Sequence, residues 1–394
     1  MTGEVEERMG AGQIRIALIC LVVICFDGFN AQVMGYAAGP LIKAFHVGRA
    51  AIGPVASAGL FGLMLGGIVL GGLGDRLGRR SVLAGSVAAF GLFSTLTAFA
   101  HSLGSLAALR FLTGVGLGGA MPAAIALVAD HAPARRRGAF VTVTACGFAI
   151  GPAIGGFVAP SLLAGGGWPA LFLAGGVIPL ILAPAIVFAL PESIGAPPQA
   201  PVAAIFAGGR LLGTVCLWVA MFMNLVGINL QTNWLPLLLT DFGYAPARAA
   251  PMSALFHVGG ALGGLAFAPL LDRVDCSKAV TVVFLLAAIA VAAIGAVGRS
   301  PAALMISIFC AGLFVVGVQS VLNALTGLFY PPGIRSTGSG WAMGIGRAGA
   351  ALGPALGSAL GGLRLATNQL FYLEAAPFLI GAAAIWLMRL QRRA

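Results

Sequence analysis

The chain has 394 residues, of which 59% are hydrophobic and only 8% are charged, and its mean hydropathy is +1.02. A soluble domain carries about 25% charged residues because its surface must be wetted. The 22 basic and 11 acidic side chains cannot do this for a soluble protein of this length. The composition therefore excludes a soluble enzyme and, despite a net charge of +11, a soluble nucleic-acid-binding protein. It predicts an all-α polytopic membrane protein.

A helix needs about 20 apolar residues to cross the hydrocarbon core of a bilayer. Counting on that length predicts twelve transmembrane helices, which are centred near residues 26, 61, 91, 117, 149, 178, 222, 261, 287, 313, 347 and 378. The first apolar run follows a mixed-charge segment and has no cleavage pattern, so it is expected to remain as the first span.

Basic residues orient these spans. With the N-terminus inside, 15 arginines and lysines fall in cytoplasmic segments and 5 in the opposite loops. Cytoplasmic loops carry the excess of positive charge in membrane proteins. Both termini are therefore expected in the cytoplasm.

The two halves of the chain repeat one pattern. Gly66-Gly67 followed by Asp75-Arg76 recurs as Gly263-Gly264 followed by Asp272-Arg273, an offset of about 200 residues. Residues 191–208 contain a polar, Pro-rich stretch between the two copies. We predict a six-helix half over residues 1–190, a cytoplasmic linker over 191–208 and a second six-helix half over 209–394. Parallel repeats of this kind are typical of carriers with a binding site between the halves.

The loop after the second predicted helix, GGLGDRLGRR over residues 71–80, resembles the signature loop of the major facilitator superfamily. Other segments are similar to the aromatic acid:proton symporter family within it, and most similar to its 3-(3-hydroxyphenyl)propionate carriers. These segments are DGFNAQ (27–32), RFLTGVGLG (110–118), NWLP (233–236), and the stretch from Tyr330 to Arg347. One departure is Asn30, which replaces the second acid of the family's DGFD-type motif.

Asp27 is the candidate proton-coupling residue. A carboxylate in the middle of a transmembrane helix costs about 2.5–3.5 kcal/mol on insertion scales, and residues of this kind mark proton and substrate pathways. Asp27 is predicted to be the only carboxylate deep in a span, and the alternative for it is a structural pair with an intramembrane arginine. His257 is a second titratable candidate, or else a packing histidine.

Arg347 and Arg110 are the candidate ligands for a substrate carboxylate, with Arg347 the first choice. Both lie among small residues inside predicted helices, and the planar guanidinium suits a carboxylate. Other side chains assigned here to the substrate site are those of Asn30, Gln231, Asn233, Gln319 and Asn323. Interhelical hydrogen bonding is an equally good interpretation of the amides.

A third group of charges falls at the cytoplasmic ends of the predicted helices. A carboxylate at a helix end can hold a neighbouring arginine and helix terminus in one conformational state. The residues assigned here to gating are Asp75, Arg76, Arg79, Asp130, Asp272 and Arg273.

The resemblance implies a secondary transporter of the bacterial inner membrane. It would import a small aromatic acid anion of the hydroxybenzoate or hydroxyphenylpropionate type together with protons. Neither a metal-binding spacing nor a nucleotide-binding motif occurs at a usable place, so we expect no cofactor, no metal, no nucleic-acid partner and no enzymatic activity. We expect a monomer. A proton-coupled drug or metabolite exporter of the same fold and a membrane sensor are the alternatives.

Overall fold

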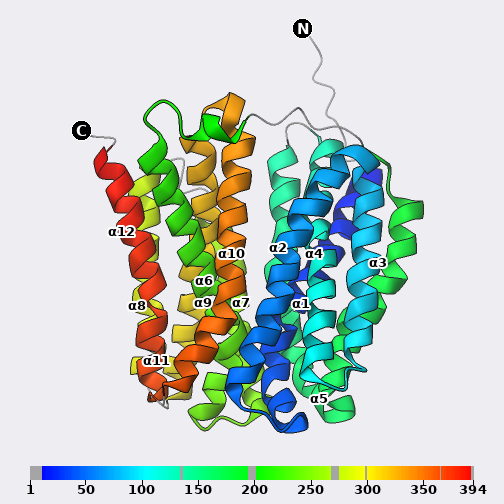
Figure 1. Ribbon diagram of the computed structural model, residues 1–394, viewed down its shortest axis with the longest axis vertical. Helices are drawn as coiled ribbons and strands as arrows, with labels where there is room; N and C mark the ends of the chain where they lie inside the picture. The colour runs from blue at the N-terminus through cyan, green and yellow to red at the C-terminus, as the bar shows by residue number, and fades with distance from the viewer. Residues whose placement is uncertain are drawn as a thin grey trace.

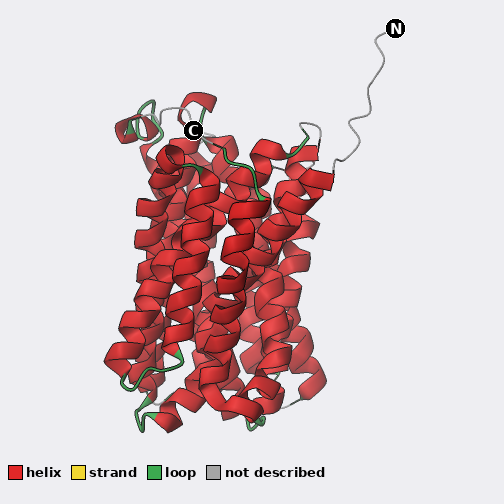
Figure 2. Ribbon diagram, turned by 90° about the vertical axis from the view of Figure 1, so that its right-hand side faces the viewer, coloured by secondary structure: helices red, strands yellow, loops and turns green. Residues whose placement is uncertain are grey.

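The computed structural model describes residues 11–133, 136–193, 201–267, 275–297, 300–363 and 365–391. In these ranges it consists of helices joined by loops, with no strand (Figure 2). The helices of the first half are α1 (Ala11–Ala44), α2 (Ile52–Leu77), α3 (Arg79–Thr97), α4 (Leu103–His131) and α5 (Arg137–Ala189), with a short helix η1 (Arg49–Ala51) before α2. Those of the second half are α6 (Leu211–Asp241), α7 (Pro246–Phe267), α8 (Cys276–Ala296), α9 (Pro301–Phe329), α10 (Arg335–Gly362), α11 (Thr367–Glu374) and α12 (Ala376–Gln391), with short helices η3 (Val202–Ile205) and η5 (Pro332–Ile334).

All twelve predicted span centres fall inside these helices. Ten helical segments of the described chain are long and apolar enough to cross a membrane. One of them, α5, has 53 residues, which at 1.5 Å per residue would extend about 80 Å. The chain instead turns back within α5 at Gly167. The φ angle of Gly167 is 64°, a value that glycine adopts readily because it has no Cβ atom. The two parts of α5 on either side of Gly167 are therefore the fifth and sixth spans. With α10 added, the predicted total of twelve is confirmed.

Two bundles of helices stand side by side (Figure 1). The first bundle, α1–α5, is built around two buried apolar cores, one of which also includes Ala250 of α7, and the second bundle, α6–α12, is built around another. The outer surface is apolar as well: the side chains of Phe188 and Ile181 are 88% and 70% exposed. Exposed apolar surface of this kind is stable only against lipid, because a water-soluble protein does not tolerate large apolar patches.

Glycines allow the same close helix packing in both bundles. A Cβ atom at Gly66 of α2 would overlap the backbone of Val115 on α4, and one at Gly263 of α7 would overlap the backbone of Leu313 on α9. Small residues let transmembrane helices approach closely where no hydrophobic force drives them together. The repeat seen in the sequence thus corresponds to one packing arrangement that is built twice.

The bundles meet near one end of the molecule. The start of α1 and the end of α12 lie at the same end, here called the terminal face, and the opposite end is the far face (Figure 1). At the far face Arg49 of η1 pairs with Asp241 of α6, and Ser358 of α10 donates a hydrogen bond to the carbonyl oxygen of Ala50 at 2.8 Å. Towards the terminal face the ribbons of α2 and α10 diverge (Figure 1).

Candidate functional site

Asp27 lies near the middle of α1 and its side chain is buried, with an exposed fraction of 2%. Its Oδ1 atom has no hydrogen-bond partner among the described residues. The positive charge of Arg347 on α10 acts on the Asp27 carboxyl group. The two side chains form no direct ion pair in the described structure. An acid of the first bundle is therefore within electrostatic range of an arginine of the second, without direct contact.

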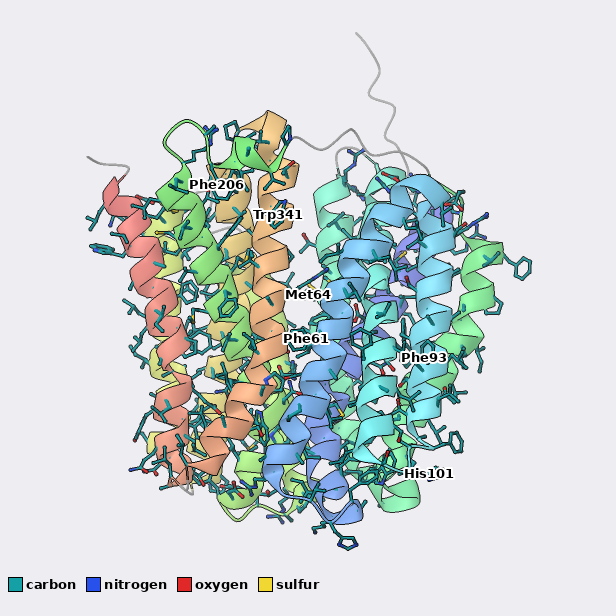
Figure 3. The ribbon with its side chains drawn as sticks, viewed as in Figure 1. Phe61, Met64, Phe93, His101, Phe206 and Trp341 are labelled. Atoms are coloured by element: carbon teal, nitrogen blue, oxygen red, sulfur yellow. The ribbon has the colours of Figure 1, made fainter. Side chains whose placement is uncertain are left out.

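Arg347 reaches from α10 to the surface of α2. Its Nη1 atom occupies the space where a Cβ atom of Gly67 would lie. A side chain at position 67 would displace the guanidinium, so the second glycine of the repeated pair makes room for an arginine of the other bundle. Figure 3 shows Phe61 and Met64 of α2 beside α10 at the same boundary.

Arg110 of α4 is buried without an acidic partner among the described residues. Its side chain is 3% exposed, Nη2 donates a hydrogen bond to Thr113 Oγ1 at 2.9 Å, and Nε has no partner. The guanidinium carbon lies 4.9 Å from the centre of the Phe172 ring, which offers a cation–π contact. An unpaired buried charge is costly, so this guanidinium is a ready ligand for an anion.

A small cavity lies beside Arg110 at the boundary between the bundles. Its volume is about 30 Å³, and Asn30 and Thr113 of the first bundle and Asn233 of the second are among its lining residues. This is room for a water molecule or two rather than for an aromatic ligand. A ligand could occupy this place only after the bundles move apart.

Asn30 bridges three helices of the first bundle. Its Nδ2 donates hydrogen bonds to the carbonyl oxygens of Phe26 and Gly175, at 3.0 and 2.8 Å, and its Oδ1 accepts one from Ser94 at 2.9 Å. The amide that replaces the family's second acid is thus held in a fixed orientation at the wall of the Arg110 cavity.

Gln231 lies away from that cavity, against a second buried carboxyl group. Its Nε2 donates to Glu374 Oε2 at 2.8 Å, and the side chain of Glu374 is only 3% exposed. The sequence places Glu374 near the outer end of its helix, and the structure adds that this carboxyl group is buried there, in a pocket that Arg49 also lines. Glu374 sits at the break between α11 and α12, which could not be located from the apolar run alone.

Gln319 and Asn323 form a separate polar group on α9. Gln319 Nε2 donates to Asn323 Oδ1 at 3.0 Å, and Gln319 Oε1 accepts from Asn224 of α6 at 2.9 Å. This group lies within the second bundle, on the terminal-face side of the middle. The structure therefore distributes the predicted amides over three places instead of one.

Gln32 connects the bundles, a role that the sequence did not indicate although Gln32 ends the DGFNAQ segment. Its Nε2 donates to the carbonyl oxygen of Thr232 at 2.6 Å, and its Oε1 lies 2.9 Å from Nε2 of His257. His257 of α7 is thus hydrogen-bonded across the boundary.

At the terminal face, Arg79 at the start of α3 forms an ion pair with Asp130 near the end of α4. Ser193 also donates a hydrogen bond to Asp130, so this cluster ties together elements of the first bundle. The other residues assigned to gating cannot be placed: Asp272 and Arg273 lie outside the described residues, as do the side chains of Asp75 and Arg76.

Glu192 joins this terminal-face cluster beyond the end of α5. Burial raises the pKa of its carboxyl group, but hydrogen bonds from Ser81 Oγ and from the backbone N–H groups of Arg80 and Ser193, with the Arg80 charge, outweigh burial. The net result is a pKa below the ordinary value. Glu192 therefore caps the start of α3 as an anion.

Two helical bundles that meet beside a buried arginine without an acidic partner among the described residues are an arrangement suited to a membrane carrier. The described residues contain no group of three metal-ligating side chains. The fold is shared with a solved D-xylose–proton symporter, at a TM-score of 0.79 and 16% identity over 95% of this chain and 97% of that one.

Sequence comparison defines the family. The chain matches the Major Facilitator Superfamily over residues 20–296 and again over residues 217–394. It is 36% identical to a gallate transporter of Pseudomonas putida, over 96% of this chain and 92% of the relative. It is 38% identical to a 3-(3-hydroxyphenyl)propionate transporter of Escherichia coli, over 95% and 93%. The chain belongs to the major facilitator superfamily, as the motifs predicted, and is a transporter rather than an enzyme.

Proposed function

We propose that this chain imports a small aromatic carboxylate, of the hydroxybenzoate or hydroxyphenylpropionate type, by proton symport across the bacterial inner membrane. The observation that carries the proposal is Arg110, a buried guanidinium without an acidic partner in the described structure, at a cavity between the bundles. The relatives that transport gallate and 3-(3-hydroxyphenyl)propionate support an aromatic acid as the substrate.

Arg110 is the proposed ligand of the substrate carboxylate. A bidentate arginine–carboxylate pair supplies both charge and orientation. Asn233 from the second bundle and the fixed Asn30 line the same cavity. Asn233 has one amide N–H left for the second carboxylate oxygen, because in the described structure Nδ2 donates only to the carbonyl oxygen of Asn229. Both N–H groups of Asn30 are used, so Asn30 can only accept a hydrogen bond, from a substrate hydroxyl group, through Oδ1. The sequence ranked Arg347 before Arg110, but the cavity and the missing counter-ion favour Arg110 for this contact.

Asp27 and Arg347 are the proposed coupling pair. When Asp27 is ionised it attracts Arg347 across the boundary. When Asp27 takes up a proton, this attraction ends and Arg347 can add its charge to the contact that Arg110 makes with the substrate anion. An anion that enters alone moves against the inside-negative potential, which costs about 2.3 kcal/mol per 100 mV. One proton carried with it removes this cost.

Transport would proceed by alternating access between a half formed by residues 1–190 and one formed by residues 209–394. The excess of basic residues in the loops of the terminal face supports an orientation with both termini in the cytoplasm. With this orientation, bundles joined at the far face and diverging at the terminal face correspond to a state closed to the outside. Arg79 and Asp130, with Asp75, Arg76, Asp272 and Arg273, would stabilise one of the two states.

Proteoliposomes containing the full chain test the proposal. Labelled 4-hydroxybenzoate and 3-(3-hydroxyphenyl)propionate should accumulate when the outside is made acidic, and a neutral drug panel should not. Asp27→Asn should abolish accumulation driven by the pH gradient while exchange of internal for external substrate partly survives. Efflux of drugs with no uptake of acids would instead identify an exporter. Full accumulation by Asp27→Asn would move the coupling role to His257.

A further inference from the structure

A large cavity opens at the far face, well separated from the terminal face. Its volume is about 820 Å³, which lies within the range of small-molecule binding sites. Segments of both bundles line it: the last turns of α1, one residue of α5, the end of α6 and the start of α7. We call this cavity the far-face vestibule. The conformational change that joins or separates the bundles must alter its shape.

The vestibule is positively charged in a chain that has few charges. Lys43 in the last turn of α1 and Arg49 of η1 both line it. Arg49 is neutralised by Asp241, to which it donates a hydrogen bond from Nη1 at 2.5 Å and a second one from Nη2. Lys43 forms no ion pair in the described structure. One positive charge therefore remains uncompensated at the wall.

Tyrosines and aliphatic side chains supply the rest of the wall. Tyr36 and Tyr244 line the vestibule, and the Tyr36 hydroxyl group donates its proton to the carbonyl oxygen of Pro152 at 2.8 Å. The Tyr36 ring is thereby fixed as an apolar surface. A cavity that combines cations with aromatic and aliphatic walls matches a ligand with a carboxylate at one end and a ring at the other.

Arg49, the vestibule cation that is paired with Asp241, also helps to close the far face. Arg49 and Ala50 belong to the same turn, and this turn is held by Asp241 of α6 and by Ser358 of α10. The Arg49 and Asp241 side chains are 40% and 22% exposed. Ion pairs with this much exposure contribute little and can be exchanged for another anion. A carboxylate in the vestibule can therefore replace Asp241 on Arg49.

We propose that the far-face vestibule binds the aromatic carboxylate before translocation, with Lys43 attracting the anion and Arg49 exchanging Asp241 for the substrate carboxylate. The exchange removes one of the contacts that close the far face, so arrival of the substrate itself favours opening. This proposal rests on the proposed function for its substrate class. It adds a binding site that is distinct from Arg110.

The test measures occupancy of the vestibule without transport. Thr240 lines the cavity and is half-buried, so Thr240→Cys introduces a thiol there with little change in size. Labelling of that thiol by a maleimide is measured by site-resolved mass spectrometry on the purified full-length chain. Arg110→Gln is present throughout to remove the central carboxylate ligand. The probes are 4-hydroxybenzoate and its neutral amide.

We expect 4-hydroxybenzoate to protect the thiol and the amide to protect it poorly. Lys43→Gln should raise the half-protecting concentration up to about fivefold, the upper end of the effect of one exposed charge. The matched control is Arg248→Gln, a nearby exposed cation that does not line the cavity, and it should leave protection unchanged. Asp241→Asn frees Arg49 and should lower the half-protecting concentration.

Two results would contradict substrate binding in the far-face vestibule. One is that the acid does not protect the thiol, and the other is that Lys43→Gln and Arg248→Gln have equal effects on protection. In either case uptake by the wild-type protein in proteoliposomes still decides the proposed function separately. Conversely, protection of the thiol together with no uptake of any aromatic acid by the wild type would contradict the proposed function and leave the anion site standing.

Discussion

Arg110→Gln tests whether an unpaired buried cation serves the substrate or the fold. In the structure the guanidinium donates one hydrogen bond, to Thr113, and its Nε has no partner, so further N–H groups remain for a carboxylate. A hydrogen bond to a charged group contributes about 1.5–3 kcal/mol. At 1.4 kcal/mol per factor of ten, removing one such bond should weaken binding of the acid by about 10- to 140-fold.

The same substitution should not destabilise the protein without substrate. No acidic partner is left unpaired by it, and the cost of burying the charge disappears. We therefore expect the melting temperature of the substrate-free variant to stay equal to that of the wild type or to rise. The loss of the Phe172 contact acts in the opposite direction and is small by comparison.

Two measurements on the purified full-length protein separate these roles: affinity for 4-hydroxybenzoate and its amide by calorimetry, and thermal unfolding in detergent. The acid should lose affinity and the amide should change little. Equal losses for the acid and the amide would refute the carboxylate contact. A lower melting temperature with unchanged affinity would show that Arg110 is structural.

Three further substitutions test other parts of the argument. Gly67→Ala should reduce uptake several-fold with little change in melting temperature, because its Cβ displaces only a flexible guanidinium, whereas Gly85→Ala, which has open space, should leave uptake unchanged in the same assay. Glu374→Ala leaves the Gln231 amide buried without its acceptor and should lower the free energy of unfolding by about 1–3 kcal/mol, while Glu374→Gln restores most of it in thermal unfolding. Because the pKa of Glu192 is lower in the folded state, its ionised carboxylate stabilises the fold at pH values above the ordinary carboxyl pKa. This stabilisation is lost as the pH falls through the folded-state pKa. In thermal unfolding measured against pH, Glu192→Gln should therefore lose less stability below about pH 4.5 than the wild type does.

The spans and their repeated arrangement follow from the sequence itself. Lipid offers no hydrogen-bond partners, so each apolar run of sufficient length must be a helix that satisfies its own backbone. The repeated glycine pairs also indicate close helix packing from the sequence. The structure agrees, because a Cβ atom at Gly66 or Gly263 would overlap the neighbouring backbone. Asp27 and the two arginines stand out for the same reason, since charges are rare in such helices.

The partners of these side chains were decided only by the tertiary structure. Spacing along one helix shows that Asn30 and Gln231 are polar positions, but not that the first is fixed by Ser94 and Gly175 or that the second meets Glu374. Those contacts depend on which faces of separate helices are packed together. Likewise, the contact between Arg49 and Asp241 joins residues 192 positions apart. The apolar pattern of a helix identifies the lipid environment, whereas the pairing of its few polar groups depends on the rotation and depth of every neighbouring helix.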